Sequence, residues 1–293
     1  MEDHKTKVGL IAGWGRYPIV VAEAIRRQGH EVCGVGLRDH VDPEFATACD
    51  TYHTCAVAHL GSIIRFFRRQ GVQRAAMAGK VYKVRLIGRW SWIKFTPDWT
   101  TLKAFYRHFI TSTRDRKDDT LLLTVVETMR RRGVTIVPPT EFAPELLVKQ
   151  GQLCGKGLST AQWKDVELGW ETAKELGRLD VGQSVAVKGR VVIAVEAIEG
   201  TDQCILRAGQ LCSSGGFAIV KVSKPQQDMR FDVPTIGMQT MQMMAKSGAS
   251  ILAIEAEKTI LVDQSEVLEF ARRHNITIVS ISEQKLSVRL RAA

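Results

Sequence analysis

The N-terminal half takes its architecture from the stretch Val8-Gly-Leu-Ile-Ala-Gly-Trp-Gly-Arg-Tyr-Pro-Ile-Val-Val-Ala-Glu-Ala-Ile-Arg-Arg-Gln-Gly29. An apolar, β-rich run ends at Gly13, and apolar residues at helical spacing then extend from Tyr17 to Gln28, before Gly29. Outward from it the alternation continues. We expect strands at Glu31 to Leu37 and Arg74 to Gly79, with a helix at Ser62 to Arg69. This rhythm predicts an α/β fold with a parallel, Rossmann-like sheet.

The glycines between the first strand and the first helix suggest a phosphate site. Gly13 and Gly15 precede a helix whose N-terminal amides can receive an anion. A dinucleotide fingerprint needs glycine where Pro18 stands, which disfavours NAD. We therefore expect Gly13 and Gly15 to bind a phosphate of the substrate, and the alternative is a glycine turn needed only for packing.

Length and composition favour two domains. The chain has 293 residues, of which 45% are hydrophobic. We predict a Rossmann-like domain at 1–140, a glycine-containing linker at 141–160, and at 161–293 a mixed α/β domain with an α+β-like sheet that carries the catalytic site. No apolar run approaches the ~20 residues of a membrane span, and the N-terminus does not resemble a signal peptide, so a cytoplasmic location is expected.

The second half contains a concentrated charged motif, Lys221-Val-Ser-Lys-Pro-Gln-Gln-Asp-Met-Arg-Phe-Asp-Val-Pro-Thr-Ile-Gly237, directly after an apolar strand pattern. Carboxylates at Asp228 and Asp232 suit Mg²⁺ or Mn²⁺. Lys221, Lys224 and Arg230 can hold phosphate oxygens. The alternative is a solvated turn whose charges pair among themselves.

A second acidic group follows another β-branched run, Val191 to Val195. Glu199 and Asp202 are candidate metal ligands, although Thr201 or Asp202 could equally cap the next helix. We expect Gly200 and Thr201 to contact the substrate and Glu196 to be an exposed strand residue opposite a lysine.

Ala197-Ile-Glu-Gly-Thr-Asp202 and Lys224-Pro-Gln-Gln-Asp-Met-Arg-Phe-Asp-Val-Pro-Thr-Ile-Gly237 together resemble motifs of the bacterial UDP-2,3-diacylglucosamine pyrophosphatases of lipid A biosynthesis. Leu10 to Pro18, Asp165 to Gly169 and Leu176 to Gln183 extend the resemblance over the chain. The resemblance implies hydrolysis of the UDP-sugar to UMP and 2,3-diacylglucosamine 1-phosphate, with water attacking the phosphorus nearer the sugar and a divalent cation present. The histidine-rich motifs of the metallophosphoesterases that catalyse the same step are missing.

These observations give one set of predicted site residues and one cofactor, Mg²⁺, with Mn²⁺ as the alternative. Asp232 is the most essential carboxylate, either as metal ligand or as the base that takes a proton from water. The catalytic residues are Asp232, Asp228, Lys224 and Arg230; the metal ligands are Asp232, Asp228, Glu199 and Asp202; the substrate-binding residues are Gly13, Gly15, Lys80, Lys221, Gly200 and Thr201.

Positive charge is concentrated in residues 51–100, which contain nine Lys or Arg and one acid, Asp98. From Lys80 to Phe95, and on to Trp99, Phe105, Tyr106 and Phe109, cations alternate with large aromatics. This composition favours contact with headgroups at the cytoplasmic face of the inner membrane; stacking on nucleic acid is the alternative, but no RNA-binding motif accompanies it.

The expected partners are an acylated UDP-sugar, the membrane surface and a second copy in a homodimer, with no nucleic acid. Two other functions remain open at this point. They are an NAD-linked oxidoreductase, suggested by the opening glycines, and a non-catalytic nucleotide- or nucleic-acid-binding protein, suggested by the net charge of +10.

Overall fold

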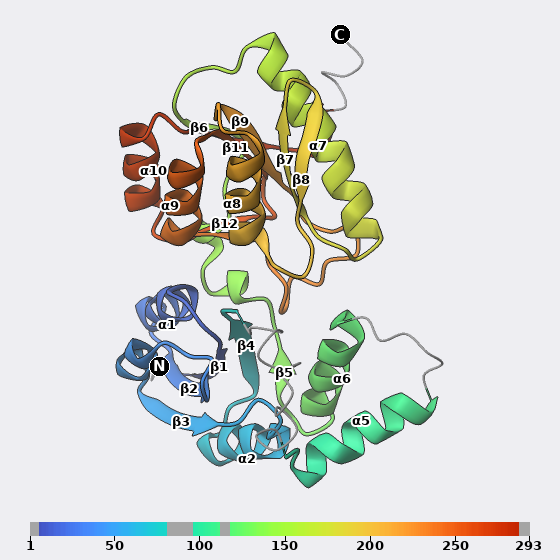
Figure 1. The fold of residues 1–293 in the computed structure, drawn as a ribbon. Coiled ribbons are helices and arrows are strands. Elements are labelled where there is room, and N and C mark those ends of the chain that lie inside the picture. Colours follow the sequence, from blue (N-terminus) through green and yellow to red (C-terminus); the bar gives the residue numbers. More distant parts are fainter. Residues whose placement is uncertain (1–5, 81–95, 112–117, 287–293) are drawn as a thin grey trace. The chain divides into compact units, whose positions relative to one another are not determined.

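The computed structural model describes residues 6–80, 96–111 and 118–286 (Figure 1). The chain forms two compact units. The first comprises Met1–Pro144 with Asp228–Phe231, and the second comprises Glu145–Gln227 with Asp232–Ala293.

The first unit contains a five-stranded parallel sheet with the strand order β3-β2-β1-β4-β5. This arrangement confirms the predicted Rossmann-like sheet. Its elements are β1 (Lys7–Ala12), α1 (Tyr17–Arg27), β2 (Glu31–Leu37), η1 (Pro43–Ala48), β3 (Thr51–Cys55), α2 (Leu60–Gln70), β4 (Arg74–Ala78), α5 (Trp99–Thr111), α6 (Asp118–Arg130), β5 (Thr135–Ile136) and η2 (Pro139–Glu141).

Alternating side chains of this sheet serve its two faces. Ile11 and Val35 belong to a core cluster that Phe67 of α2 and Met129 of α6 complete. Leu10, which points the other way along β1, is also fully buried, on the side that α1 covers. The direction of strand succession reverses at β1 and β4, and such a switch point is where open α/β sheets form a crevice.

The second unit contains a mixed six-stranded sheet with the order β6-β13-β11-β9-β7-β8. Strands β9, β11 and β13 are parallel, β7 is antiparallel to both β8 and β9, and β6 is antiparallel to β13, as predicted for a mixed α/β domain. Its elements are η3 (Pro144–Leu146, which begins one residue earlier), β6 (Gly151–Cys154), α7 (Thr160–Arg178), β7 (Ser184–Lys188), β8 (Val191–Val195), α8 (Thr201–Leu211), β9 (Phe217–Lys221), β10 (Thr235–Ile236), α9 (Met238–Ser247), β11 (Ala249–Glu255), β12 (Ile260–Leu261), α10 (Gln264–Arg273) and β13 (Thr277–Ile281).

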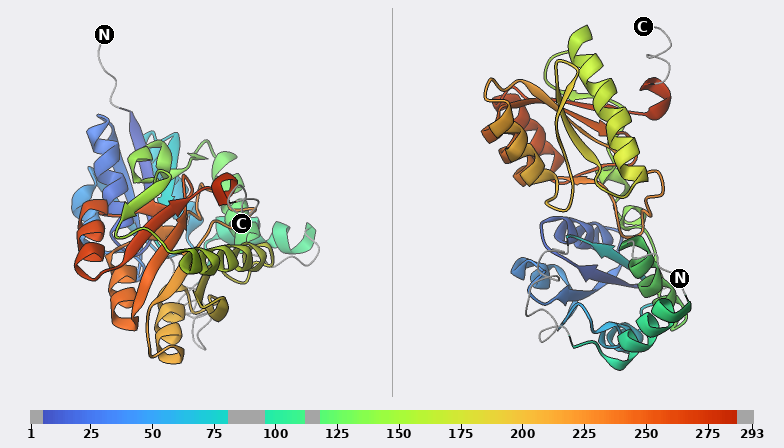
Figure 2. Two further views of the ribbon diagram at one scale, coloured as in Figure 1. Left: turned by 90° about the horizontal axis from the view of Figure 1, so that it is seen from above. Right: turned by 45° about the vertical axis from the view of Figure 1, so that its right-hand side comes forward.

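Helices cover both faces of the second sheet (Figure 2). Trp170 of α7 packs with Val185 and Val220 on one face. On the other, side chains of alternate parity such as Ile219 pack with Met241 of α9 and with α8 and α10. The period-2 alternation of apolar residues therefore places the sheet between two helical layers.

Side-chain hydrogen bonds determine where α7 begins and hold the neighbouring β7–β8 turn against it. Ser159 and Gln162 form a reciprocal capping box at the start of α7. Asp165, buried in α7, accepts hydrogen bonds from the amides of Gly189 (3.0 Å) and Arg190 (2.5 Å) in the turn between β7 and β8. Asp165, which begins the segment Asp165 to Gly169 that resembles the family, therefore has a structural role.

Residues 141–160, predicted as a linker, contain secondary structure. η3 lies in this segment, and β6 pairs with β13 at the edge of the second sheet. The strand β6 was not predicted because it has only four residues, two of which are glycine and glutamine, and an alternation this short does not indicate a strand. Among all the helices in the described part of the chain, none has both the length and the apolar character that spanning a bilayer requires.

Candidate active site

Strands of the second sheet bring polar residues to one edge. The parallel strands β9 and β11 end at Lys221 and Glu255. Because β7 is antiparallel to β9, its first residue, Ser184, lies opposite Lys221. Glu196 directly follows β8 and lies at the same edge. Ligands of open α/β sheets bind outside the carboxyl ends of parallel strands, so this edge is the candidate site.

Three of these residues, Lys221, Glu196 and Ser184, form a buried, hydrogen-bonded group with Thr201, the Lys221 cluster. Lys221 Nζ donates to Thr201 Oγ1 over 2.9 Å, and that hydroxyl donates to Glu196 Oε1 over 2.9 Å. Ser184 Oγ lies 3.3 Å from Thr201 Oγ1. No member is more than 8% exposed. An ammonium and a carboxylate, linked through one hydroxyl, thus compensate each other's burial.

Glu196 keeps one acceptor unused. Its Oε2 is buried and has no hydrogen-bond partner in the structure as described. Buried carboxylate oxygens are normally paired, and an orphaned one marks a position where a donor from a ligand or water fits. The expectation that Glu196 is an exposed strand residue is wrong: it is 8% exposed, because the antiparallel pairing of β7 with β9 places Lys221 near it and Thr201, five residues on, folds back to donate to it.

Helix α8 begins within the cluster. Gly200 is its N-cap residue, with φ at +83°, where a side chain would strain the backbone. Thr201 is the first helical residue, so the positive end of the helix lies beside the ammonium of Lys221. The helix amides and this ammonium together make the edge attractive to a phosphate.

The two predicted metal ligands near α8 contact protein groups. Thr240 of α9 donates to Asp202 Oδ1 over 2.8 Å, which ties the first turn of α8 to α9. Glu199 forms an ion pair with Arg207. Partial burial opposes ionisation of Glu199, but hydrogen bonds from its own backbone amide and from Arg207 lower its pKa overall.

A second buried ion pair organises the segment after β9. Glu255, 2% exposed, accepts from Lys174 Nζ at 2.8 and 2.9 Å and from the amide of Ser223 at 2.7 Å. Lys174 also donates to the carbonyl of Ser223 over 3.1 Å. These contacts fix the backbone two residues beyond Lys221 and therefore hold the start of the charged motif.

Lys224, a predicted phosphate ligand, forms an ion pair within the second unit. Its Nζ lies 2.6 Å from Asp180 Oδ1, and its amide donates to Gln227 Oε1 over 2.7 Å. Both side chains of the ion pair are largely buried, at 16% and 22% exposed. Lys224 can reach a ligand only by exchanging or sharing Asp180.

Asp228 and Arg230 form a forked ion pair. Arg230 Nε donates to the two carboxylate oxygens at 2.9 and 3.1 Å, and Nη2 lies 2.5 Å from Oδ2. These hydrogen bonds lower the pKa of Asp228 and raise that of Arg230. Both residues belong to the first unit, and the neighbouring Phe231 packs against the core of that unit, whereas Asp232 belongs to the second.

No group of three His, Cys, Asp or Glu side chains arranged to hold a metal ion occurs in residues 6–80, 96–111 and 118–286. The oxygens of Asp228, Glu199 and Asp202 accept hydrogen bonds from Arg230, Arg207 and Thr240. The structure therefore contains no preformed protein cage for Mg²⁺ among these residues.

The predicted glycine site lies at the switch point of the first sheet. The amide of Gly13 donates to the carbonyl of Ala78 over 2.8 Å, and Trp14 and Lys80 exchange two backbone hydrogen bonds. A Cβ on Gly13 would lie 2.7 Å from the carbonyl oxygen of Lys80. Gly13 is thus required for close packing of the chain, and its amide is already used. Gly15 has φ at +104°, and Lys80 is exposed.

Most of the basic aromatic segment, residues 81–95, lies outside the described residues. Its described continuation exposes Trp99 and Tyr106 on α5.

Sequence reasoning missed four polar residues that shape the site: Ser184, Glu196, Lys174 and Glu255. Ser184, Lys174 and Glu255 lie far along the chain from their partners, whereas Glu196 is only five residues from Thr201 but is buried through the pairing of the strands. The antiparallel placement of β7 beside β9 was the missing information, because it determines which residues meet Lys221.

Comparison with known proteins agrees with this architecture. The LpxI N-terminal domain matches residues 7–146, and the LpxI C-terminal domain matches residues 149–279. A relative from Caulobacter vibrioides, named UDP-2,3-diacylglucosamine pyrophosphatase LpxI, is 28% identical over 288 residues, which cover 95% of this chain and 99% of the relative. The two domains together span nearly the whole chain, and it belongs to the LpxI family.

Proposed function

We propose that this protein hydrolyses the pyrophosphate bond of UDP-2,3-diacylglucosamine and releases UMP and 2,3-diacylglucosamine 1-phosphate for lipid A biosynthesis. The observation that carries the proposal is the end-to-end similarity to a relative named for this activity. The buried ammonium of Lys221 beside the N-terminus of α8, at the candidate ligand-binding edge of the second sheet, supports it.

The Lys221 cluster supplies charge stabilisation. A diphosphate resists hydrolysis because its anionic oxygens repel the nucleophile, and fixed donors that face the developing charge lower this barrier. Lys221 and the first amides of α8 are such donors, held in a site shielded from water. They would contact phosphate oxygens in the ground state and more strongly as charge develops.

Glu196 is a positioning residue in this proposal. Because the Thr201 hydroxyl donates its proton to Glu196, its oxygen is turned to accept from Lys221. This relay fixes the direction of the ammonium without leaving a buried charge uncompensated.

Asp232 is proposed as the most important carboxylate, either as the base that accepts a proton from the attacking water or as a metal ligand. It lies half-buried in the second unit, eleven residues after Lys221. Asp228, Lys224 and Arg230 are proposed to contact phosphate after exchanging their present ion-pair partners.

A requirement for Mg²⁺, or Mn²⁺, is also part of the proposal. Mg²⁺ is usually bound by one or two carboxylates together with substrate phosphates, and this fits a chain whose described residues lack a three-ligand group. When bound, the ion would neutralise phosphate charge as a Lewis acid. Asp232 and Asp202 are the proposed carboxylates in the second unit, with Glu199 and Asp228 as further candidates.

The acylated substrate implies contact with the cytoplasmic face of the inner membrane, and this location is proposed with the activity. The homodimer stays a prediction. Membership of a family whose named relative is a hydrolase disfavours both the NAD-linked oxidoreductase and the non-catalytic nucleotide- or nucleic-acid-binding protein.

Hydrolysis in ¹⁸O-labelled water tests the proposal. Purified protein, detergent-dispersed UDP-2,3-diacylglucosamine and Mg²⁺ should yield UMP, with the label in the sugar 1-phosphate, and a chelator should stop the reaction. Asp232→Ala should abolish turnover, whereas Glu171→Ala, an exposed acid on α7, should not. Absence of UMP from the unmodified protein would refute the proposed activity.

A further inference from the structure

Helix α5 exposes an apolar stripe. Trp99, Leu102 and Tyr106 are 77%, 48% and 64% exposed. At about 100° per residue, these positions fall within a sector of about 60° on the helix surface. Three large side chains thus project side by side from one face, where single exposed apolar residues would need no explanation.

The opposite face of α5 is anchored. Thr101 is 6% exposed, and its hydroxyl oxygen accepts from the amide of Leu60 in α2 over 3.0 Å. Asp98 caps the helix, because its Oδ1 accepts from the amide of Thr101 over 2.9 Å. Exposure of the stripe therefore belongs to a helix with a fixed orientation on the first unit.

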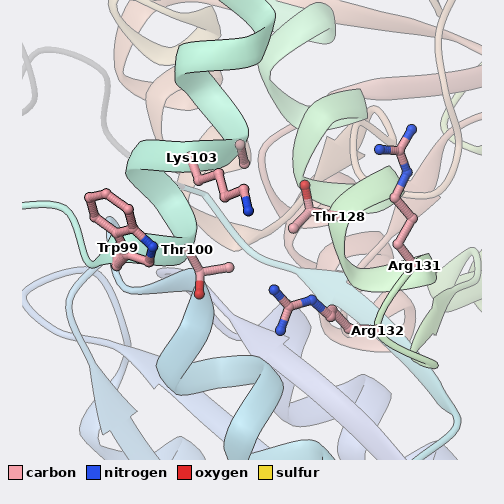
Figure 3. Close-up of a pocket in the computed structure, with 7 residues that line it drawn as sticks. Trp99, Thr100, Lys103, Thr128, Arg131 and Arg132 are labelled. Carbon is pink, nitrogen blue, oxygen red and sulfur yellow. The ribbon is translucent and has the colours of Figure 1, made fainter.

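A basic pocket of about 260 Å³ lies beside the stripe, between α5 and α6. Its lining includes Lys103 and Thr100 from α5 and Thr128, Arg131 and Arg132 from α6 and its end. Figure 3 shows the ammonium of Lys103 and the guanidinium of Arg132 directed toward the space between the two helices. Such donors match the oxygens of a phosphate group.

The charge of this pocket is not cancelled locally. Glu127 is shared by Arg130 and Arg131, each at 2.8 Å. Lys103 and Arg132 take part in no ion pair within the part of the chain that the structure describes. A surplus of positive charge therefore remains beside the apolar stripe.

We propose that α5 and the end of α6 form a docking surface for an anionic lipid bilayer, in which Trp99, Leu102 and Tyr106 enter the headgroup region while Lys103, Arg131 and Arg132 bind a lipid phosphate. Aromatic and aliphatic side chains next to cations are the composition of interfacial helices. The proposed function enters this inference in one respect: it supplies the reason for docking, which is to bring the candidate site to a substrate held in the membrane.

The apolar stripe favours a bilayer over a nucleic acid. Nucleic acids need cations along a track and aromatics that stack on bases. An aliphatic residue, Leu102, stands between the two aromatics, and insertion into lipid gives all three side chains an apolar environment.

Vesicle cosedimentation tests the docking surface. The full chain is mixed with phosphatidylcholine vesicles, with or without phosphatidylglycerol, at low and high salt. One variant combines Trp99→Ser with Leu102→Ser, and a second combines Lys103→Gln with Arg132→Gln. Their matched controls are Val191→Ser with Leu211→Ser, which alter exposed apolar residues of the second unit, and Lys164→Gln with Arg272→Gln, which remove two exposed charges there.

The unmodified protein should bind anionic vesicles in a salt-sensitive way. Each of the two docking variants should lose at least about tenfold in affinity. The controls should bind like the unmodified protein, and all variants should keep its thermal melting and its turnover of detergent-dispersed substrate. Equal binding by the docking variants, no binding of anionic vesicles by the unmodified protein, or binding of an RNA oligonucleotide in place of vesicles would overturn the proposal. Because vesicles contain no substrate, this result is separate from the presence or absence of pyrophosphatase activity.

Discussion

The ammonium nitrogen of Lys221 lies 2.9 Å from the hydroxyl oxygen of Thr201, which joins the last residue of β9 to the first residue of α8. This contact places a buried cation at the positive end of a helix. The positive charge of the Lys221 ammonium and the partial positive charge of the helix N-terminus raise the free energy of this buried place unless an anion is present. The carboxylate of Glu196, which accepts from Thr201, compensates part of this positive charge. A phosphate of the substrate can supply the rest.

Replacement of Glu196 distinguishes positioning from charge. Glu196→Gln can still accept from Thr201, so we expect kcat to fall modestly, by about tenfold or less, with KM little changed. Glu196→Ala removes the acceptor and should lower kcat by a further factor of about ten. Steady-state kinetics of the two variants measure this order; equal activity of both would show that Glu196 does not orient Thr201.

Replacement of Gly200 tests the start of α8. Gly200→Ala meets no atom within 4 Å but forces a side chain onto a backbone with φ at +83°. We expect a loss of about 1–3 kcal/mol in the free energy of unfolding, together with lower turnover as Thr201 shifts. Gly157→Ala, also in open space but without positive φ, is the control and should be neutral. Urea denaturation of both variants decides the point.

Glu255 and Lys174 should be coupled in stability. Glu255→Ala leaves the largely buried ammonium of Lys174 without its counter-ion and the amide of Ser223 without its acceptor, and a cost of about 3–5 kcal/mol is expected. Lys174→Met combined with Glu255→Leu removes both charges and should recover much of it. A double-mutant cycle from denaturant unfolding measures the coupling; additive losses would contradict a tight pair.

The pair Asp228 and Arg230 predicts a pH dependence. Hydrogen bonds from Arg230 lower the pKa of Asp228, so its stabilising contribution is present above the ordinary Asp pKa of about 3.9 and is lost as pH falls further. Because Arg230 is about one-third exposed, the contribution at neutral pH should be only about 0.5–1 kcal/mol. The stability gap between the unmodified protein and Asp228→Asn should narrow as pH falls below about 4. A gap that stays constant with pH would argue against this ion pair.

The sequence predicted those features that local patterns encode. Strand and helix periodicity from Val8 to Gly79 predicted β1, α1, β2, α2 and β4, because each of these elements carries its own signal, whereas β3 was not predicted. The structure places Lys221 at the end of a buried strand and Thr201 at the start of a helix, as the sequence predicted, and their contact with substrate stays a prediction. Both positions follow from the sequence pattern of the adjacent residues.

Features that depend on long-range pairing were missed or left open. The burial of Glu196 follows from the pairing of β7 with β9, which no residue near Glu196 specifies. Asp228 and Arg230 bind each other in this structure, and a role of Asp228 as a metal ligand stays a prediction. At Gly13 the nearby carbonyl of Lys80, 67 positions along the chain, explains the glycine by close packing.

The most direct test of the central claim is the rate of UMP release from UDP-2,3-diacylglucosamine by a protein that lacks the buried ammonium. Lys221→Met combined with Glu196→Gln removes the cation and the anion together, so the fold should survive, as checked by circular dichroism and thermal melting. The account predicts that kcat/KM falls at least about 100-fold while Lys258→Met, an exposed lysine near Glu255, remains like the unmodified protein. Unmodified rates in the folded double variant would contradict it.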